Sequence, residues 1–308
     1  MRTQSQKRVY NSYIIFRLCG AAAMMCAFVV ITTARSGPFG RCFEAIEYGR
    51  ADGVPLVLDA CIPGGDGVSP AVILVHGGGW SGGNRRDMAF WFEPLSRADV
   101  AGFSISYRLA PTHRWPACIE DVKTAVRWVR ANASAYAVDP NRIALMGYSA
   151  GGHLATFAAV TAESEERVQA VVGLAAPTDL EADSERRGGL SASLQNLFGR
   201  SETLDEQARA LLRRCSPLYH LNRDLPPFLL VHGTNDASVA YSQSVNFQTA
   251  LKTHHVPCVL RTLDGAGHRI AEWETYDPNY LPKTVRWLAD TLAAVQPAGT
   301  EQSDKARQ

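Results

Sequence analysis

A serine placed between glycines is the residue whose type and surroundings predict chemistry most directly. Residues 147–151 (GYSAG) fit the pattern G-x-S-x-G, in which a tight turn between a strand and a helix exposes the serine hydroxyl. The apolar run 143–146 has the length of a buried strand, and small residues typical of a helix follow the turn. Glycines are needed because a Cβ would collide with the adjoining strand or helix. We therefore predict Ser149 as a nucleophile at the carboxyl end of a sheet.

A serine hydroxyl is a poor nucleophile at neutral pH, so it needs a base and an acid that orients this base. His268 follows the last predicted strand, residues 258–263, and Asp236 follows the strand before it, residues 227–231. Because parallel strands end at the same edge of a sheet, both side chains should lie beside Ser149. The order Ser149, Asp236, His268 is that of a nucleophile-elbow hydrolase.

Other histidines and acids are alternatives to this set. Asp179 and Asp264 are the fallback acids, since an aspartate in a glycine-containing loop often serves only the turn. His254 and His255 end a predicted helix, where positive charge complements the helix dipole, and His153 lies inside the helix after the turn. The remaining histidines are His76, His113, His220 and His232.

Acyl transfer places negative charge on the substrate oxygen, and this charge must meet N–H donors. The glycines of residues 76–80 (HGGGW) allow bare amides to approach such an oxygen. We predict the amides of Gly78, Gly79 and Ala150 as donors. Phosphate binding is the alternative for a glycine-rich loop, but the P-loop Lys-Ser/Thr and the G-x-G-x-x-G spacing are missing. Metal-ligand spacing such as H-E-x-x-H is missing too, so we expect neither a cofactor nor a metal.

Buried strands alternate with helices around these residues. Residues 71–75 and 168–175 are apolar runs typical of strands covered on both faces. Residues 118–132 carry their apolar side chains at helical spacing. This order predicts an α/β fold with a mostly parallel, doubly wound sheet. The other expected elements are a strand at 100–107 and helices at 87–99, 203–214, 241–254 and 280–295.

The chain has 308 residues, of which 46% are hydrophobic, and this suits one large domain, placed at residues 42–295. Residues 180–219 are charged and weakly patterned, which indicates a small cap-like insertion over the carboxyl edge or a solvated excursion. Residues 296–308 form a polar tail that we expect to be disordered. A net charge of +1 gives no broad basic surface, so we expect no nucleic-acid partner. The sequence makes no prediction of oligomeric state.

Residues 1–34 resemble a secretory signal. A basic start precedes the apolar run 18–33, and cleavage is expected near Ala34. The protein should then be secreted or periplasmic, and the alternative is an uncleaved segment that attaches it to a membrane.

Two of the seven cysteines lie in this export segment, which leaves an odd number after cleavage. Cys42 and Cys61 flank a predicted hairpin of strands 44–48 and 55–62. Counting outward from its turn at 51–53 sets the two cysteines opposite each other. A disulfide between them is a hypothesis that suits an oxidising compartment, and buried thiols are the alternative.

Together, several motifs resemble the signature set of the α/β-hydrolase fold carboxylesterases, in particular the bacterial feruloyl-esterase-like branch near the hormone-sensitive-lipase group. The motifs are HGGGW at 76–80, SYRLAP at 106–111, DPNRIALMGYSAGGHLA at 139–155, HGTND at 232–236 and GAGH at 265–268. The resemblance implies hydrolysis of small to medium acyl or aryl esters through an acyl-enzyme, with Ser149 as nucleophile, His268 as base and Asp236 as its partner. The HGGG loop would be the oxyanion hole.

Two positions depart from the hormone-sensitive-lipase pattern. Tyr148 stands where many relatives have Asp, and Ala240 replaces a Pro often found after the acid, so the feruloyl-esterase-like branch fits better. Amide hydrolysis, as in arylformamidases or peptidases of this fold, is one alternative function, and a noncatalytic binding member of the fold is another. Aromatic residues that could line an acyl or aryl pocket are Trp80, Trp91, Tyr107 and Trp115.

Overall fold

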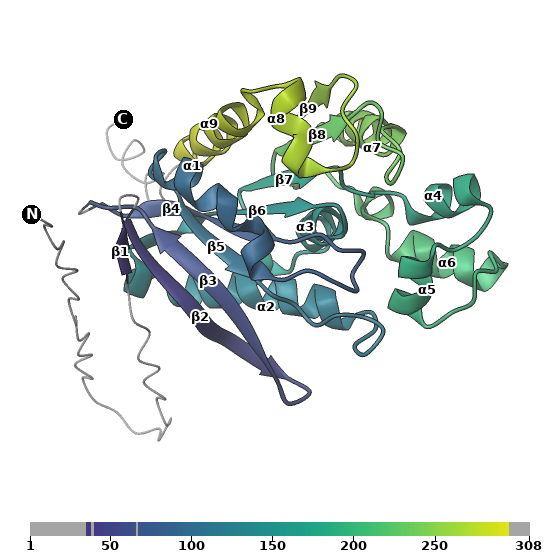
Figure 1. Cartoon of the computed structure of the whole chain (residues 1–308), viewed down its shortest axis with the longest axis horizontal. Helices are drawn as coiled ribbons and strands as arrows, with labels where there is room; N and C mark the ends of the chain where they lie inside the picture. The colour runs from purple at the N-terminus through teal and green to yellow at the C-terminus, as the bar shows by residue number, and fades with distance from the viewer. Residues whose placement is uncertain (1–34, 38–39, 66, 296–308) are drawn as a thin grey trace, which may run out of the picture.

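One nine-stranded sheet organises the part of the chain that the computed structural model describes, residues 35–37, 40–65 and 67–295 (Figure 1). The strand order is β1-β2-β3-β5-β4-β6-β7-β8-β9. The strands are β1 (Arg35–Gly37), β2 (Gly40–Ala51), β3 (Val54–Ile62), β4 (Ser69–Val75), β5 (Ala101–Ile105), β6 (Val138–Tyr148), β7 (Ala170–Leu174), β8 (Phe228–Gly233) and β9 (Cys258–Leu263).

The first strands pair antiparallel, and every pairing from β5 through β4 to β9 is parallel. The predicted mostly parallel, doubly wound sheet is thus confirmed. The chain crosses from β5 over β4 to β6, and the carboxyl ends of strands beside such a crossing are where α/β proteins place their sites.

Helices cover both faces of the sheet, because successive strand side chains point to opposite faces. Ile73 belongs to one hydrophobic core together with α2 and α3, whereas its neighbour Leu74 belongs to the other core, with α1 and α9 (Figure 1). The α-helices are α1 (Phe92–Ser96), α2 (Ala117–Ala131), α3 (Ala150–Val160), α4 (Leu180–Arg187), α5 (Ala192–Phe198), α6 (Glu206–Arg214), α7 (Ser242–Thr253), α8 (Trp273–Tyr276) and α9 (Tyr280–Ala293). The 3₁₀ turns are η1 (Arg85–Trp91), η2 (Ala133–Tyr136), η3 (Ser164–Glu166), η4 (Pro217–His220) and η5 (Ile270–Glu272).

The prediction of one α-helix over 87–99 is wrong, because a 3₁₀ helix and a short α-helix follow each other there. The segment begins earlier, as η1, where Asn84 and Asp87 form a reciprocal cap, and only then becomes the short α1. Pro94 lies in the first turn of α1, where its missing N–H costs no helical bond. The sheet also starts at Arg35, ahead of the predicted domain boundary at residue 42.

The insertion at 180–219 contains three helices, α4, α5 and α6, which lie together beyond one end of the sheet (Figure 1). Each begins with a side chain that caps its first turn, namely Asp179, Ser191 and Asp205. Leu197 and Leu212 are fully buried in the core that includes α2 and α3. The alternative of a solvated excursion is therefore wrong.

The hypothesised disulfide joins Cys42 and Cys61, which are direct partners in the register of β2 and β3. Cys118, Cys215 and Cys258 are free. The predicted export segment and carboxyl-terminal tail lie outside the described residues. Within the described residues, no helix combines the length and apolarity needed to cross a membrane.

Replacing Gly151 by alanine should destabilise the protein. A Cβ there would collide with the carbonyl oxygens of Val75 and His76 at the end of β4, and overpacking of this kind costs about 1–3 kcal/mol or more. Urea unfolding measures the loss. Gly67→Ala is the control, because a Cβ at Gly67 meets nothing within 4 Å. Equal stability of the two variants would contradict the packing described for the turn.

Candidate active site

The turn between β6 and α3 holds Ser149 in a strained conformation, with φ 54° and ψ −120°. Its amide donates a hydrogen bond of 2.8 Å to the carbonyl oxygen of Leu174, which fixes the turn against β7. The flanking glycines allow the turn to close tightly, because a Cβ on Gly147 would collide with the carbonyl of Gly151. The serine hydroxyl consequently projects from the carboxyl edge of the sheet.

The structure brings the three predicted side chains together. His268 Nε2 lies 2.9 Å from Ser149 Oγ, and His268 Nδ1 lies 2.7 Å from Asp236 Oδ2. A carboxylate can only accept, so Nδ1 carries the proton and donates it to Asp236. Nε2 is then free to accept from the serine hydroxyl, which is the arrangement that a general base requires.

Asp236 is held in its charged form. Its Oδ1 accepts hydrogen bonds from the amides of Ser238 at 2.8 Å and Val239 at 2.9 Å. Burial acts to raise the pKa of Asp236, but hydrogen bonds from His232, His268 and the Val239 amide outweigh it and hold the pKa well below its usual range. This side chain is fully buried, whereas His268 stays partly exposed.

His232 is a partner of Asp236 that the sequence reasoning missed, because it treated this residue only as an alternative base. His232 Nε2 lies 3.0 Å from the Val239 carbonyl and 3.3 Å from Asp236 Oδ2, while Nδ1 lies 2.7 Å from Ser244 Oγ. Since the carbonyl only accepts, Nε2 carries the proton and donates it to Val239, and this polarised N–H lies close enough to Asp236 to favour its charged form. The sequence feature that could have indicated this contact is the position of His232, four residues before Asp236 and near the end of β8.

Neither fallback acid contacts His268. Asp179 accepts a hydrogen bond from the Ala182 amide at the start of α4, and Asp264 accepts one from the Thr234 hydroxyl. Asp179 thus caps α4, and Asp264 links the loop after β9 to the loop after β8.

The glycine loop, residues 76–80, lies beside the serine turn. Gly78 has φ +111° and Gly79 φ +58°, conformations that favour glycine. Among the residues that the structure describes, the amides of Gly78, Gly79 and Ala150 have no acceptor. Ala150 is the first residue of α3, so its N–H precedes the helical bonds. The structure therefore leaves the predicted role of these three amides as donors open to test.

A buried histidine ties the glycine loop to the insertion. The Trp80 indole donates to His153 Nδ1 at 3.2 Å, and His153 Nε2 donates to the carbonyl of Cys215, after α6, at 2.7 Å. Burial lowers the pKa of His153 to about 4, so it is neutral at pH 7. The insertion also contacts the loop directly: Ser193 Oγ lies 2.6 Å from where a Cβ on Gly79 would be.

Three of the four aromatic residues considered for an acyl pocket separate into two groups, while Tyr107 stacks on His76. Trp80 and Trp115 both pack on His153, under the insertion, whereas Trp91 packs against Tyr280 in the core on the other face of the sheet. Trp91 therefore belongs to the α9 core, away from the cluster around His153.

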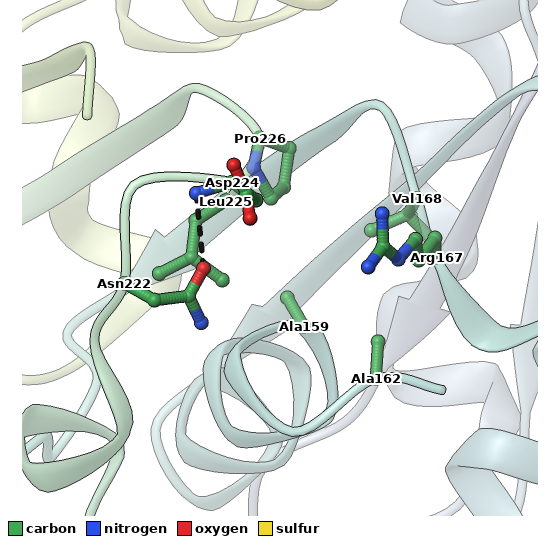
Figure 2. A pocket seen from close by; sticks show the side chains of 8 residues that line it. All are labelled: Ala159, Ala162, Arg167, Val168, Asn222, Asp224, Leu225 and Pro226. Carbon is green, nitrogen blue, oxygen red and sulfur yellow. Dashed lines mark hydrogen bonds between the residues drawn. The ribbon is translucent and has the colours of Figure 1, made fainter. Parts of the chain in front are cut away.

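A separate hollow of about 220 Å³ lies where α3 ends and where the chain enters β7 and β8, at the opposite edge of the sheet (Figure 2). Its lining residues are Ala159, Ala162, Arg167, Val168, Asn222, Asp224, Leu225 and Pro226. None of them is a predicted site residue. Within the described ranges, no cluster of three or more His, Cys, Asp or Glu side chains could hold a metal ion.

Solved structures of esterases share this architecture. A truncated carbohydrate esterase from gut microbiota has a TM-score of 0.71 and 26% identity, with 82% of this chain and 96% of the other covered. A butyrate-bound esterase, Est2, from Thermogutta terrifontis has a TM-score of 0.65 and 25% identity, with 82% and 92% covered. The predicted α/β-hydrolase fold is confirmed.

Sequence comparison defines the family. The BD-FAE family profile matches residues 58–251, and the chain belongs to this family. Mycobacterium tuberculosis esterase LipC is 36% identical over 215 residues, 65% of this chain and 53% of LipC. The probable carboxylic ester hydrolase LipM of the same organism is 32% identical, with 67% and 50% covered. The chain thus spans about half the length of these curated relatives.

Asp236→Asn should lower the free energy of unfolding at pH 7 by about 1–3 kcal/mol, because buried donors lose a charged acceptor. The folded pKa lies below the unfolded value of about 3.9, so this stabilisation is present above pH 4 and is lost as the pH falls toward 2. Urea unfolding at several pH values should therefore show the gap between variant and wild type closing in acid. Asp290→Asn, on the exposed side of α9, is the control. A gap that stays constant with pH would contradict the assignment.

Gly79→Ala should impair any reaction that uses the glycine loop amides, since a Cβ at φ +58° is strained and would press on Ser193. We expect kcat for an aryl acetate to fall by about 10²-fold, as for loss of an oxyanion donor. The double variant Gly79→Ala/Ser193→Gly removes the collision but keeps the strain, and should recover only part of the rate. Full activity of the single variant would contradict a role for this loop.

Proposed function

We propose that this protein hydrolyses carboxylic esters of small to medium acyl or aryl groups through an acyl-enzyme intermediate. The observation that carries the proposal is the pair of hydrogen-bond distances at His268, 2.9 Å to Ser149 Oγ and 2.7 Å to Asp236 Oδ2. Esterases among the relatives and structural neighbours support the same chemistry.

In the first half of the reaction, Ser149 Oγ attacks the ester carbonyl carbon while His268 Nε2 takes the hydroxyl proton. The imidazolium is stabilised by Asp236, whose lowered pKa keeps it anionic. The tetrahedral oxyanion accepts hydrogen bonds from the glycine loop and the first amide of α3. As the intermediate collapses, His268 returns the proton to the departing alcohol, which leaves an acyl group on Ser149.

In the second half, water takes the place of the alcohol. His268 Nε2 accepts a proton from water as its oxygen attacks the acyl carbon, and the same donors stabilise the second oxyanion. Collapse breaks the bond between the acyl carbon and Ser149 Oγ, and His268 returns the proton to Oγ, which restores the serine hydroxyl and releases the acid. No cofactor enters either half.

The substrate class that we propose is a short acyl ester, including acetyl or hydroxycinnamoyl groups on plant polysaccharide. Support comes from a structural neighbour whose name specifies a carbohydrate esterase, the truncated enzyme from gut microbiota. We also propose export to the periplasm or the medium, and the Cys42–Cys61 disulfide supports an oxidising compartment.

Ser149→Ala should lower kcat for p-nitrophenyl acetate by about 10⁴-fold or more while leaving the unfolding midpoint close to that of wild type. The variant should also lose labelling by a fluorophosphonate probe. Ser134→Ala, at an exposed serine of η2, is the matched control and should keep full activity. A Ser149→Ala protein that hydrolyses the ester at nearly the wild-type rate would refute the assignment.

The same wild-type preparation separates the other functions. Hydrolysis of an aryl acetate in preference to a formanilide and a peptide anilide is the expected result. Preference for either anilide would support amide hydrolysis, and a wild-type protein that neither hydrolyses these compounds nor reacts with the probe would support a noncatalytic role.

A further inference from the structure

The residue directly before the nucleophile contacts the loop that carries the base. Tyr148 Oη donates a hydrogen bond of 2.6 Å to the backbone carbonyl of His268, 120 residues away. Its ring also stacks on the His268 imidazole, with centroids 5.3 Å apart and planes inclined by 30°. Tyr148 therefore contacts both the backbone and the side chain of His268.

A second aromatic side chain supports this contact. The Trp273 indole donates to the carbonyl of Gly267 at 2.9 Å, and its ring meets the Tyr148 ring edge-on at 6.1 Å. Adjacent carbonyls of the base loop, those of Gly267 and His268, are thus each held by one of two aromatic rings that pack on each other. Trp273 is fully buried, so the support rests on the core.

The hydroxyl of Tyr148 stays protonated, as a donor must. Burial raises its pKa to about 12, although a hydrogen bond with the backbone of Ile270 partly opposes this effect. The ring lies close against Gly77, because a Cβ on Gly77 would be only 2.9 Å from a Tyr148 ring carbon. Tyr148 consequently lies between the glycine loop and the base loop.

We propose that Tyr148 is a positioning residue, which sets the distance between His268 Nε2 and Ser149 Oγ by holding the carbonyl of His268. The inference rests on the proposed function and adds to it a residue that acts through His268. His268 lies in a loop after β9, so the position of its imidazole depends on how firmly the backbone of this loop is held. A misplacement of about 1 Å can cost up to about 10²-fold in rate.

Tyr148→Phe tests the hydroxyl while keeping the ring. We expect kcat for p-nitrophenyl acetate to fall by about tenfold and KM to stay within about twofold, because substrate binding does not involve this bond. Tyr48→Phe is the matched control. Tyr48 lies in β2, and its Oη donates a hydrogen bond of 2.7 Å to the Ser106 carbonyl, so this variant loses the same kind of bond. It should show a comparable change in the unfolding midpoint and an unchanged kcat.

An NMR measurement tests the placement of His268 without relying on the turnover rate. The Nδ1 proton of His268, bonded to Asp236, should give a low-field NMR resonance, which Tyr148→Phe should shift or broaden and Tyr48→Phe should leave in place. The rate of fluorophosphonate labelling should fall in Tyr148→Phe in proportion to kcat. If this variant fails to fold, Trp273→Phe removes the neighbouring bond to Gly267 and should change the same resonance and rate.

The outcomes separate the two proposals. An active wild type with an unchanged kcat and resonance in Tyr148→Phe overturns the inference and leaves the proposed function in place. Equal loss of kcat in Tyr148→Phe and Tyr48→Phe also overturns it, because the effect would then be one of general stability. A wild type without hydrolysis or probe labelling refutes the proposed function and the inference with it.

Discussion

The close backbone contact between the serine turn and the end of β4 is the constraint on which the site depends. Gly147 and Gly151 let the turn close on itself, and Gly151 also lets it rest against the carbonyls of Val75 and His76. Because β4 runs directly into the glycine loop, this contact fixes the serine relative to the three predicted donor amides. The serine turn and the glycine loop thus form one unit held by backbone contacts.

The acid and base reach this unit from β8 and β9, and hydrogen bonds fix their positions. Asp236 is surrounded by donors from its own loop and from His232, so it needs no solvent to remain charged. His268 is different, since its loop follows β9 at the outermost position of the sheet. The aromatic contacts of Tyr148 and Trp273 place it from the serine side.

Local patterns predict the order of strands and the three converging side chains, because apolar runs and strand ends can be recognised in a short window. Such patterns do not predict contacts between residues that are distant in the sequence. In the insertion, α6 lies inside the predicted helix at 203–214, but α4 and α5 are short helices, capped by the single residues Asp179 and Ser191, that no pattern indicated. The contact of His232 with Asp236 and the hydrogen bond from Tyr148 to His268 depend on side-chain directions that residue spacing does not predict. The first half of β6 escaped prediction because residues 139–142 are polar.

The insertion leaves and rejoins the fold at nearly the same place. The Leu218 amide donates to the Thr178 carbonyl at 3.0 Å, and the Leu180 amide donates to Ser216 Oγ at 2.8 Å, so its two ends are fastened to each other. A segment closed at its base can lengthen, shorten or change sequence without disturbing the sheet. The helices beside the glycine loop can therefore vary in sequence and length while the strand ends that hold Ser149, Asp236 and His268 keep their places.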